Sequence, residues 1–265
     1  MGKILSLRTL ILAAGKGTRM KSDLPKVLHP LAGRPMLSYV LDVARTIGSE
    51  KIVVIVGHCA DNVCETFADR DLFFVEQREQ LGTGHAVLQA SGCFRGYEGL
   101  VVILCGDVPL LRPETILSLV SRHRDDGSVL TVLTTVLDDP GTYGRIVKSD
   151  EGRVVKIVEQ RDATEEEKLI REINTGIYCV DSRFLFSAVG EIGNNNAQKE
   201  YYLTDFVGIA IAKGHRVGAL MAGDSFEVMG INTLEDLRMA SWKMEDRHID
   251  PLAGVALASS REQKA

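Results

Sequence analysis

Four short apolar runs, separated by helical patterns, most limit what this chain can fold into. They cover residues 9–13, 52–56, 72–75 and 100–104, and they show no two-residue alternation of apolar and polar side chains. Continuous apolar strands of this kind are typical of a parallel sheet that is covered on both faces. The first half of the chain therefore predicts a doubly wound α/β sheet with right-handed crossovers.

The segments between these runs carry helical signals. Pro35 suits a first helical turn and Gly48 suits a helix end. Further helices are expected over residues 83–90 and 113–123. The first helix would bury one stripe of side chains, made of Met36, Tyr39, Val40, Val43, Ala44 and Ile47.

Past residue 140 the pattern changes to a β-rich one. Residues 143–148 and 153–159 flank a turn-rich tetrad and predict a hairpin, and a strand is expected over 172–180. We interpret residues 1–246 as one domain, with a small β-rich lobe over about 140–230. Residues 247–265 read as a polar C-terminal tail.

Two capping boxes predict helix starts in the second half. Thr164 with Glu167 would open a short charged helix, and Thr233 with Asp236 would open a longer one. A helix over 201–212 is also expected. The residues expected to face inward from the last helix are Leu234, Leu237, Ala240 and Met244.

Composition excludes several classes of function. The 265 residues carry a net charge of −5 and no basic block, which argues against a general nucleic-acid binder. The apolar stretches are too short to cross a bilayer, so no membrane role is expected. An odd number of scattered cysteines without a C-x-x-C pair indicates reduced thiols in a cytoplasmic protein. We expect all five to be buried: Cys59, Cys64, Cys93, Cys105 and Cys179.

The segment "LILAAGKGTRMKSDLPKVL" (10–28) places glycines and cations at the end of the first strand. Ligands of open α/β sheets bind at the carboxyl ends of the strands, where glycines let backbone N–H groups approach an anion. With Arg19 and Lys26 nearby, this pattern predicts a polyphosphate site. It is neither a Walker A loop nor a dinucleotide fingerprint, since Met20 replaces the third glycine. The alternative is an ordinary tight turn.

These motifs resemble those of a known family. "LAAGKGTRM" followed by "LPKVL" resembles the signature of sugar-1-phosphate nucleotidylyltransferases. Over about residues 8–245, motif order and spacing resemble the bacterial N-acetylglucosamine-1-phosphate uridylyltransferase domain. The further matching segments are "EQLGTGHA" (79–86), "GDVPLL" (106–111), "YGRIV" (143–147), "IVEQRDAT" (157–164), "EINTGIY" (172–178), "NNNAQKEYYLTD" (194–205) and "EVMGIN" (227–232).

The resemblance implies a Rossmann-like mixed sheet of the nucleotide-diphospho-sugar transferase type, with a sugar-binding lobe. It also implies a Mg²⁺-assisted reaction in which UTP and N-acetylglucosamine 1-phosphate give UDP-N-acetylglucosamine and pyrophosphate. Arg19 and Lys26 match the catalytic positions, and Asp107 and Asn232 match the metal ligands. The nucleotide-binding positions match Leu12, Ala13, Ala14, Gly15, Lys16, Gly17, Gln77, Gly82 and Thr83. The sugar-binding positions match Gly144, Glu159, Asn174, Tyr202 and Thr204.

Such a reaction needs no general base, because the attacking sugar phosphate has a second pKa of about 6 and is already ionised. Catalysis would then consist of alignment and charge stabilisation. The chain accordingly offers no plausible Ser–His–Asp or Cys–His set. Its histidines are expected to be structural or to lie on the surface.

Structural alternatives remain open for several of these residues. Lys26 could be a solvated surface lysine, and Asp107 could cap a turn before Pro109. Asn232 could cap the helix that begins beside Thr233. Tyr202 could be a core aromatic residue on the helix expected over 201–212.

The chain also departs from the family pattern. Cys105 stands where the family usually has tyrosine before Gly-Asp, and Lys199 replaces a usual glycine. No hexapeptide run follows residue 246, so neither the acetyltransferase activity of the bifunctional members nor their trimerisation platform carries over. We therefore expect a monomer or a weak oligomer.

Three other functions fit parts of the pattern. The acceptor could be another sugar 1-phosphate, such as glucose 1-phosphate. The chain could instead be a non-catalytic nucleotide-sugar-binding regulatory module. A glycosyltransferase of related topology would need an Asp-x-Asp motif, and the sequence Asp107-Val108-Pro109 lacks the second aspartate.

Overall fold

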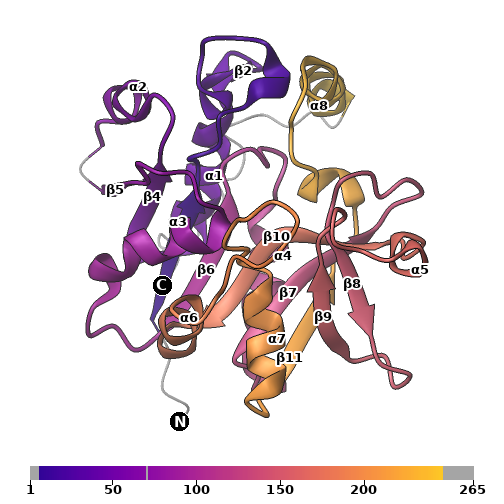
Figure 1. Ribbon diagram of the computed structural model, residues 1–265. Coiled ribbons are helices and arrows are strands. Elements are labelled where there is room, and N and C mark those ends of the chain that lie inside the picture. Colours follow the sequence, from indigo (N-terminus) through magenta and orange to yellow (C-terminus); the bar gives the residue numbers. More distant parts are fainter. Residues whose placement is uncertain (1–5, 70, 247–265) are drawn as a thin grey trace, which may run out of the picture.

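A mixed sheet forms the centre of the computed structural model, which describes residues 6–69 and 71–246 (Figure 1). The nine strands of this sheet are β1 (Leu7–Leu12), β4 (Ile52–Val56), β5 (Leu72–Glu76), β6 (Leu100–Cys105), β7 (Leu130–Val136), β8 (Arg145–Lys148), β9 (Val154–Val158), β10 (Glu172–Asp181) and β11 (Val217–Met221). The main path runs β11-β7-β10-β6-β1-β4-β5. Its strands pair in parallel except at β10, which is antiparallel to both β6 and β7.

Helices cover both faces of the sheet and make two apolar cores. Alternate β1 residues face opposite cores: Ile11 packs into the first and Leu10 into the second. This arrangement confirms the predicted doubly wound α/β fold. The first core is covered by α1 (Met36–Thr46), α2 (Ala60–Thr66) and α4 (Pro113–Asp126), and the second by α3 (Thr83–Gln89), α6 (Ser182–Val189) and α7 (Asp205–Ala212).

The predicted hairpin is confirmed, and it forms a lobe beside the main sheet. β8 and β9 pair antiparallel, and the turn between them closes through Ser149 N–H donating 2.8 Å to the Arg153 carbonyl. β8 also pairs with β10 through Arg145 and Ile173. The lobe is therefore an extension of the sheet.

A smaller third core brings the C-terminal helix back to the N-terminal part of the chain. Ala240 and Met244 of α8 (Leu234–Asp246) pack with Leu31 and Met36 near the two-stranded ribbon of β2 (Pro30–Leu31) and β3 (Arg34–Pro35). Figure 1 shows α8 beside β2. The segment that precedes α8 is thereby held over the loop that follows β1.

Both predicted capping boxes are present. The Thr164 hydroxyl accepts from Glu167 N–H at the start of α5 (Glu165–Lys168), and the Glu167 carboxylate accepts from Thr164 N–H. Thr233 and Asp236 exchange the same pair of bonds before α8. Within residues 6–69 and 71–246, no helix combines the length and the apolar composition that crossing a bilayer requires.

Three local expectations are wrong. The helix expected over 201–212 begins only at Asp205, because backbone groups of the preceding residues bond to the segment around Gly84. Leu234 is 45% exposed, since it lies at the open end of α8. Among the cysteines, Cys179 is buried, whereas the others are only half-buried: Cys59, Cys64, Cys93 and Cys105. The tail predicted over 247–265 lies outside the described residues.

Candidate functional site

A cavity of about 350 Å³ lies at the carboxyl ends of β1 and β6, where the sequence predicts a ligand. Most of the predicted nucleotide-binding residues line it, together with Lys26 and Asp107. Gln80 and Glu200 also line it and were missed: both lie in matching segments, but neither was singled out as a site residue. The lining residues are Leu12, Ala13, Ala14, Gly15, Lys26, Val27, Gln77, Gln80, Gly82, Thr83, Ala86, Cys105, Asp107 and Glu200.

The loop after β1 is held at its base and open at its tip. Gln80 donates a 2.8 Å bond from Nε2 to the Ala14 carbonyl, and Gly106 N–H donates to the Leu12 carbonyl. Gly15 is exposed, and a Cβ added there would meet nothing within 4 Å. Gly17 has a φ of +60°, and an added Cβ would lie 2.6 Å from Lys26 Cβ. This loop therefore leaves room for an anion beside backbone N–H groups.

The two predicted catalytic cations meet the two predicted metal ligands. Lys26 donates from Nζ to Asp107 Oδ2, and also to Asn232 Oδ1 at 3.0 Å. Arg19 donates from Nη2 to the same Asn232 oxygen at 2.9 Å. The Lys26 side chain is only 13% exposed. The alternative of a solvated surface lysine is therefore wrong.

The capping alternative for Asn232 is also wrong. Its side chain donates 3.0 Å from Nδ2 to the Gly230 carbonyl and accepts from the two cations, while Thr233 caps α8. The Asp107 carboxylate bonds to Lys26 rather than to a turn. Both side chains thus direct an oxygen at one ammonium group.

This pair of oxygens fits a small divalent cation. Asp107 Oδ2 and Asn232 Oδ1 already converge on one positive charge, the Lys26 ammonium. Among residues 6–69 and 71–246 there is no cluster of three or more His, Cys, Asp and Glu side chains suited to a metal. Mg²⁺ takes oxygen ligands, keeps several waters and needs few protein groups. One carboxylate and one amide oxygen are thus a suitable donor set.

Three of the predicted nucleotide-binding residues, Gln77, Gly82 and Thr83, line the cavity from the segment after β5. Gln77 follows β5, is 4% exposed, and donates 3.0 Å from Nε2 to the Gly82 carbonyl. Gly82 has a φ of +111°. The Thr83 hydroxyl accepts from Leu203 N–H, so this side chain joins the wall to the segment that leads into α7.

Four of the five predicted sugar-binding residues form one cluster under the lobe. The Thr204 hydroxyl donates 3.0 Å to Glu159 Oε1, and Asn174 N–H donates 2.9 Å to the Gly144 carbonyl. A Cβ added at Gly144 would lie 3.5 Å from both Glu159 carboxylate oxygens. Burial raises the pKa of Glu159, and the Thr204 hydroxyl partly opposes that shift.

Tyr202 has a hydrogen-bond partner outside this cluster. It is buried, and its hydroxyl accepts a 2.9 Å bond from Gln198 Nε2. It precedes α7, so the alternative of a core aromatic residue on that helix is wrong in its helical part. Its role in sugar binding stays a prediction.

Cys105 adds an unreactive thiol to the cavity wall. Its Sγ lies 3.4 Å from the Gly176 carbonyl oxygen, to which it donates. Burial, reinforced by the Asp107 carboxylate, raises its pKa to about 12. The group is a neutral thiol at physiological pH, with neither the ring nor the hydroxyl of the usual tyrosine.

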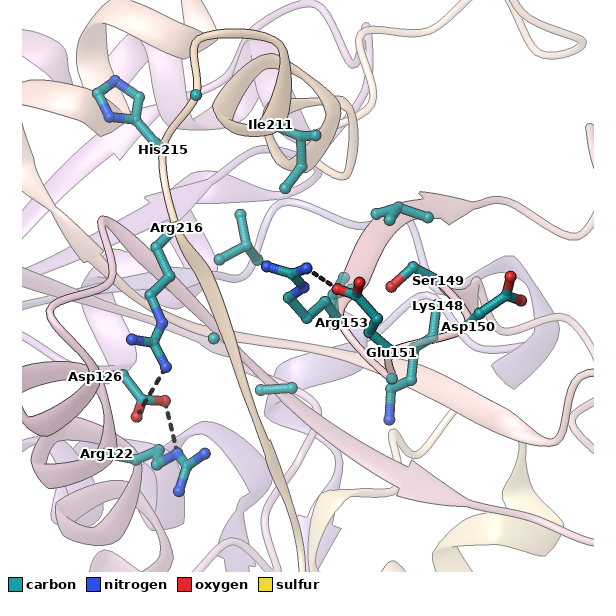
Figure 2. Close-up of a pocket in the computed structure, with 17 residues that line it drawn as sticks. Arg122, Asp126, Lys148, Ser149, Asp150, Glu151, Arg153, Ile211, His215 and Arg216 are labelled. Carbon is teal, nitrogen blue, oxygen red and sulfur yellow. Dashed lines mark ion pairs between the residues drawn. The ribbon is translucent and has the colours of Figure 1, made fainter.

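A larger cavity, of about 1020 Å³, lies between the β8–β9 hairpin and β11 (Figure 2). None of the predicted site residues lines it. Its arginines are paired within it: Arg122 and Arg216 lie 2.7 and 3.5 Å from Asp126, and Arg153 pairs with Glu151. Lys148 pairs with Glu172, which lies outside the lining. Paired charges offer little to an incoming anion, so its size does not mark it as the functional site.

Comparison with known proteins shows the family to which this chain belongs. Residues 9–172 match the MobA-like NTP transferase domain. The chain belongs to this family of NTP transferase domains. The match begins in β1 and includes Arg19, Lys26 and Asp107, but it ends before Asn174 and Asn232.

Relatives of this NTP transferase domain confirm the resemblance seen in the motifs. A protein named bifunctional protein GlmU from Geobacter metallireducens is 53% identical over 235 residues, which are 88% of this chain and 49% of that protein. Its counterpart from Geobacter sulfurreducens is 50% identical over 95% of this chain and 54% of its own length. The chain thus spans about half the length of these curated relatives.

Solved structures show the same fold. A UDP-glucose pyrophosphorylase complexed with UDP-glucose superposes with a TM-score of 0.74, at 19% identity, over 92% of this chain and all of that one. A putative glucose-1-phosphate thymidylyltransferase from Bacillus anthracis gives a TM-score of 0.72, at 20% identity, over 91% of this chain and 96% of that one. At such identities the likeness establishes the fold of the NTP transferase domain.

Proposed function

We propose that this chain transfers the uridylyl group of UTP to N-acetylglucosamine 1-phosphate, forming UDP-N-acetylglucosamine and pyrophosphate. The observation that carries the proposal is the convergence of Lys26, Arg19, Asp107 and Asn232 beside the glycine-rich loop. Such a group of residues can bind a triphosphate and a metal ion, and can stabilise the negative charge that develops on the reacting phosphates.

The chemistry is an in-line displacement at phosphorus. A non-bridging oxygen of the sugar phosphate forms a bond to the α-phosphorus of UTP. The bond from that phosphorus to the oxygen bridging to the β-phosphate breaks, and its electron pair leaves with pyrophosphate. The attacking oxygen is already ionised, because its pKa is about 6. The protein therefore aligns the two phosphates and stabilises the growing charge.

Each residue has a role in that scheme. Lys26 and Arg19 would bind phosphate oxygens, and Asp107 and Asn232 would hold Mg²⁺. When bound, the metal neutralises triphosphate charge and assists departure of pyrophosphate. The other residues of the glycine-rich loop after β1, including Lys16 and Gly17, would wrap the triphosphate.

The sugar would bind under the β8–β9 lobe. Glu159 can accept from sugar hydroxyls, and Asn174 offers both a donor and an acceptor. Gly144 leaves space beside the Glu159 carboxylate. The choice of an N-acetylated sugar rests on the eight matching motifs and on the relatives named GlmU.

A second acceptor has specific support. The two solved structures of this fold carry names that refer to glucose 1-phosphate and UDP-glucose. Glucose 1-phosphate is therefore the alternative acceptor, with the same catalytic residues.

We further propose that residues 1–246 are one catalytic domain working in the cytoplasm as a monomer or weak oligomer, without nucleic-acid or membrane partners. Five unpaired cysteines are in keeping with a reducing compartment.

The test is a pyrophosphate-release assay on the full chain. UTP, dTTP and CTP are each combined with N-acetylglucosamine 1-phosphate, glucose 1-phosphate and galactose 1-phosphate, with and without Mg²⁺. We expect Mg²⁺-dependent release that is fastest with UTP and N-acetylglucosamine 1-phosphate. Equal or better turnover with glucose 1-phosphate would replace the acceptor, and no release with any pair would overturn the proposed function.

A further inference from the structure

Two acceptors, the Gly82 carbonyl and His85 Nδ1, together set the orientation of the Gln77 amide. Its Nε2 lies 3.0 Å from the Gly82 carbonyl oxygen, which can accept a hydrogen bond but cannot donate one. The NH₂ group must therefore face Gly82, and the amide oxygen must face away from it. A turned amide would set two oxygens against each other on the wall of the cavity.

His85 holds the second hydrogen of the same NH₂ group. Its Nδ1 lies 3.1 Å from Gln77 Nε2. Since that nitrogen has only hydrogens to offer, Nδ1 accepts, and the neutral ring carries its proton on Nε2. Both amide hydrogens of Gln77 are thus engaged, one by Gly82 and one by His85.

The rest of the His85 environment is compatible with this tautomer. The structure records the Gln89 amide nitrogen 3.0 Å from His85 Nε2. Gln89 is exposed, so a half-turn of its amide brings its oxygen there to accept the Nε2 proton. The His85 ring also lies against Tyr201, with ring centroids 6.3 Å apart. The ring is therefore held from several sides.

With both hydrogens engaged, Gln77 can offer a ligand only its oxygen Oε1. Among residues 6–69 and 71–246, no group donates to this oxygen, and Gln77 lines the cavity at the end of β1. An oxygen fixed in this way selects for a base that presents an N–H. The imide of uracil presents N3–H, whereas cytosine presents an unprotonated N3 at the same position of its edge.

We infer that His85 is a positioning residue that fixes the Gln77 amide and thereby makes the site prefer an imide base over cytosine. The inference rests on the proposed function, because it concerns how that site reads its nucleotide. His85 itself need not touch the nucleotide. If the Nδ1 acceptor were lost, Gln77 could turn and offer N–H groups to cytosine N3.

Two substitutions at position 85 separate positioning from packing. His85→Leu fills a similar volume with an apolar side chain and removes the acceptor. His85→Asn places an amide oxygen on Cγ, the atom that carries Nδ1 in histidine, and so restores an acceptor. Gln89→Leu is the matched control, because it removes the partner of the other ring nitrogen at an exposed position. If His85→Leu does not fold, His85→Ala takes its place.

The readouts are the kcat/KM ratio for UTP over CTP and the Kd of each nucleotide by calorimetry. We expect His85→Leu to lower the preference for UTP over CTP about tenfold, both in kcat/KM and in Kd. Tenfold corresponds to the loss of roughly one hydrogen bond, and the change should come mainly from weaker UTP binding. His85→Asn and Gln89→Leu should stay within about threefold of the unmodified chain. An unchanged preference in folded His85→Leu, or equal losses in the Asn and Leu variants, would overturn the inference.

The same data keep this inference apart from the proposed function. If the unmodified chain binds UTP more tightly than CTP but releases no pyrophosphate, the proposed function fails and the role of His85 is judged by the Kd values. If it releases pyrophosphate with unchanged preference in His85→Leu, the inference alone fails.

Discussion

Lys26 and Asn232 are 206 positions apart in the chain, yet the Lys26 ammonium donates across 3.0 Å to Asn232 Oδ1. Lys26 lies in a short 3-10 turn after the glycine-rich loop, and Asn232 lies just before α8. Packing of α8 on β2 brings the two together. The candidate site is therefore complete only when the C-terminal helix is docked on the N-terminal loop.

Replacing Lys26 by alanine should abolish most turnover without unfolding the chain. Removal of one charged group from a preorganised phosphate site typically costs about 10²–10³ in kcat. Lys26 and Asp107 line the cavity and are only 13% and 20% exposed, so the loss of their ion pair should lower the free energy of unfolding while the chain stays folded. Pyrophosphate release and thermal melting measure the two effects.

Lys21→Ala is the matched control for that experiment. Lys21 is an exposed lysine on the same loop. Its φ is +51°, and alanine at this position would have the same backbone strain, so the substitution changes only the side chain. Its turnover should stay within about twofold of the unmodified chain. Equal losses in both variants would show that general positive charge, rather than the position of Lys26, supports the reaction.

Gly82→Ala should damage both the fold and nucleotide binding. An added Cβ would lie 2.6 Å from the Tyr201 carbonyl oxygen and 2.8 Å from its nitrogen, and φ is +111°. Both contacts are with backbone, so neither can be relieved by a rotamer change. We expect the free energy of unfolding to fall by about 2 kcal/mol or more, and UTP affinity to fall with it.

Urea denaturation and calorimetry check this expectation, and Gly92→Ala is the control. Gly92 lies in a 3-10 turn after α3, and an added Cβ there would meet nothing within 4 Å. Its free energy of unfolding should change by less than about 0.5 kcal/mol. A Gly82→Ala chain as stable as the Gly92→Ala chain would contradict the steric explanation.

The fold was predictable where strands are buried on both faces, as β4 and β6 are. β7 was not predicted, because its buried face includes threonines, such as Thr131 and Thr134, that interrupt the apolar run. β11 was missed because it is the edge strand of the main path and is only half-buried. Local pattern detects continuous apolar sequence: β7 is buried along most of its length but its threonines interrupt that pattern, and β11 is only half-buried.

The site was predictable only in part for a related reason. Lys26 and Asp107 follow a glycine-rich loop and a buried strand, so the end of the sheet predicts them. Asn232 carries no such local signal, and only the family resemblance indicated it. The predicted start of α7 was wrong because Gly84 N–H donates to the Tyr201 carbonyl, a long-range contact that helical periodicity in the local sequence cannot reveal.

Lys199→Gly should stabilise the chain. Lys199 has a φ of +57°, a left-handed conformation that costs a residue with a Cβ roughly 1–2 kcal/mol. Glycine removes that strain but is more flexible when unfolded, so we expect a net gain of about 0.5–1 kcal/mol in the free energy of unfolding. Lys199→Ala loses the charge and keeps the strain. Equal stabilisation by both variants would assign the effect to charge instead.

His123 should make the fold sensitive to mild acid. It is 3% exposed, its Nδ1 lies 3.0 Å from the Thr131 hydroxyl, and burial lowers its pKa from 6.5 to about 4. Between these values the unfolded chain binds a proton that the native chain does not, so stability falls as pH falls from 6.5 toward 4. From pH 7.5 to 5 this loss should be on the order of 2 kcal/mol. Urea titrations at both pH values measure it, with His123→Gln as the non-titrating control. Between pH 7.5 and 5, the free energy of unfolding of His123→Gln should fall by about 2 kcal/mol less than that of the unmodified chain. Equal falls in both chains would show that other groups cause the acid sensitivity.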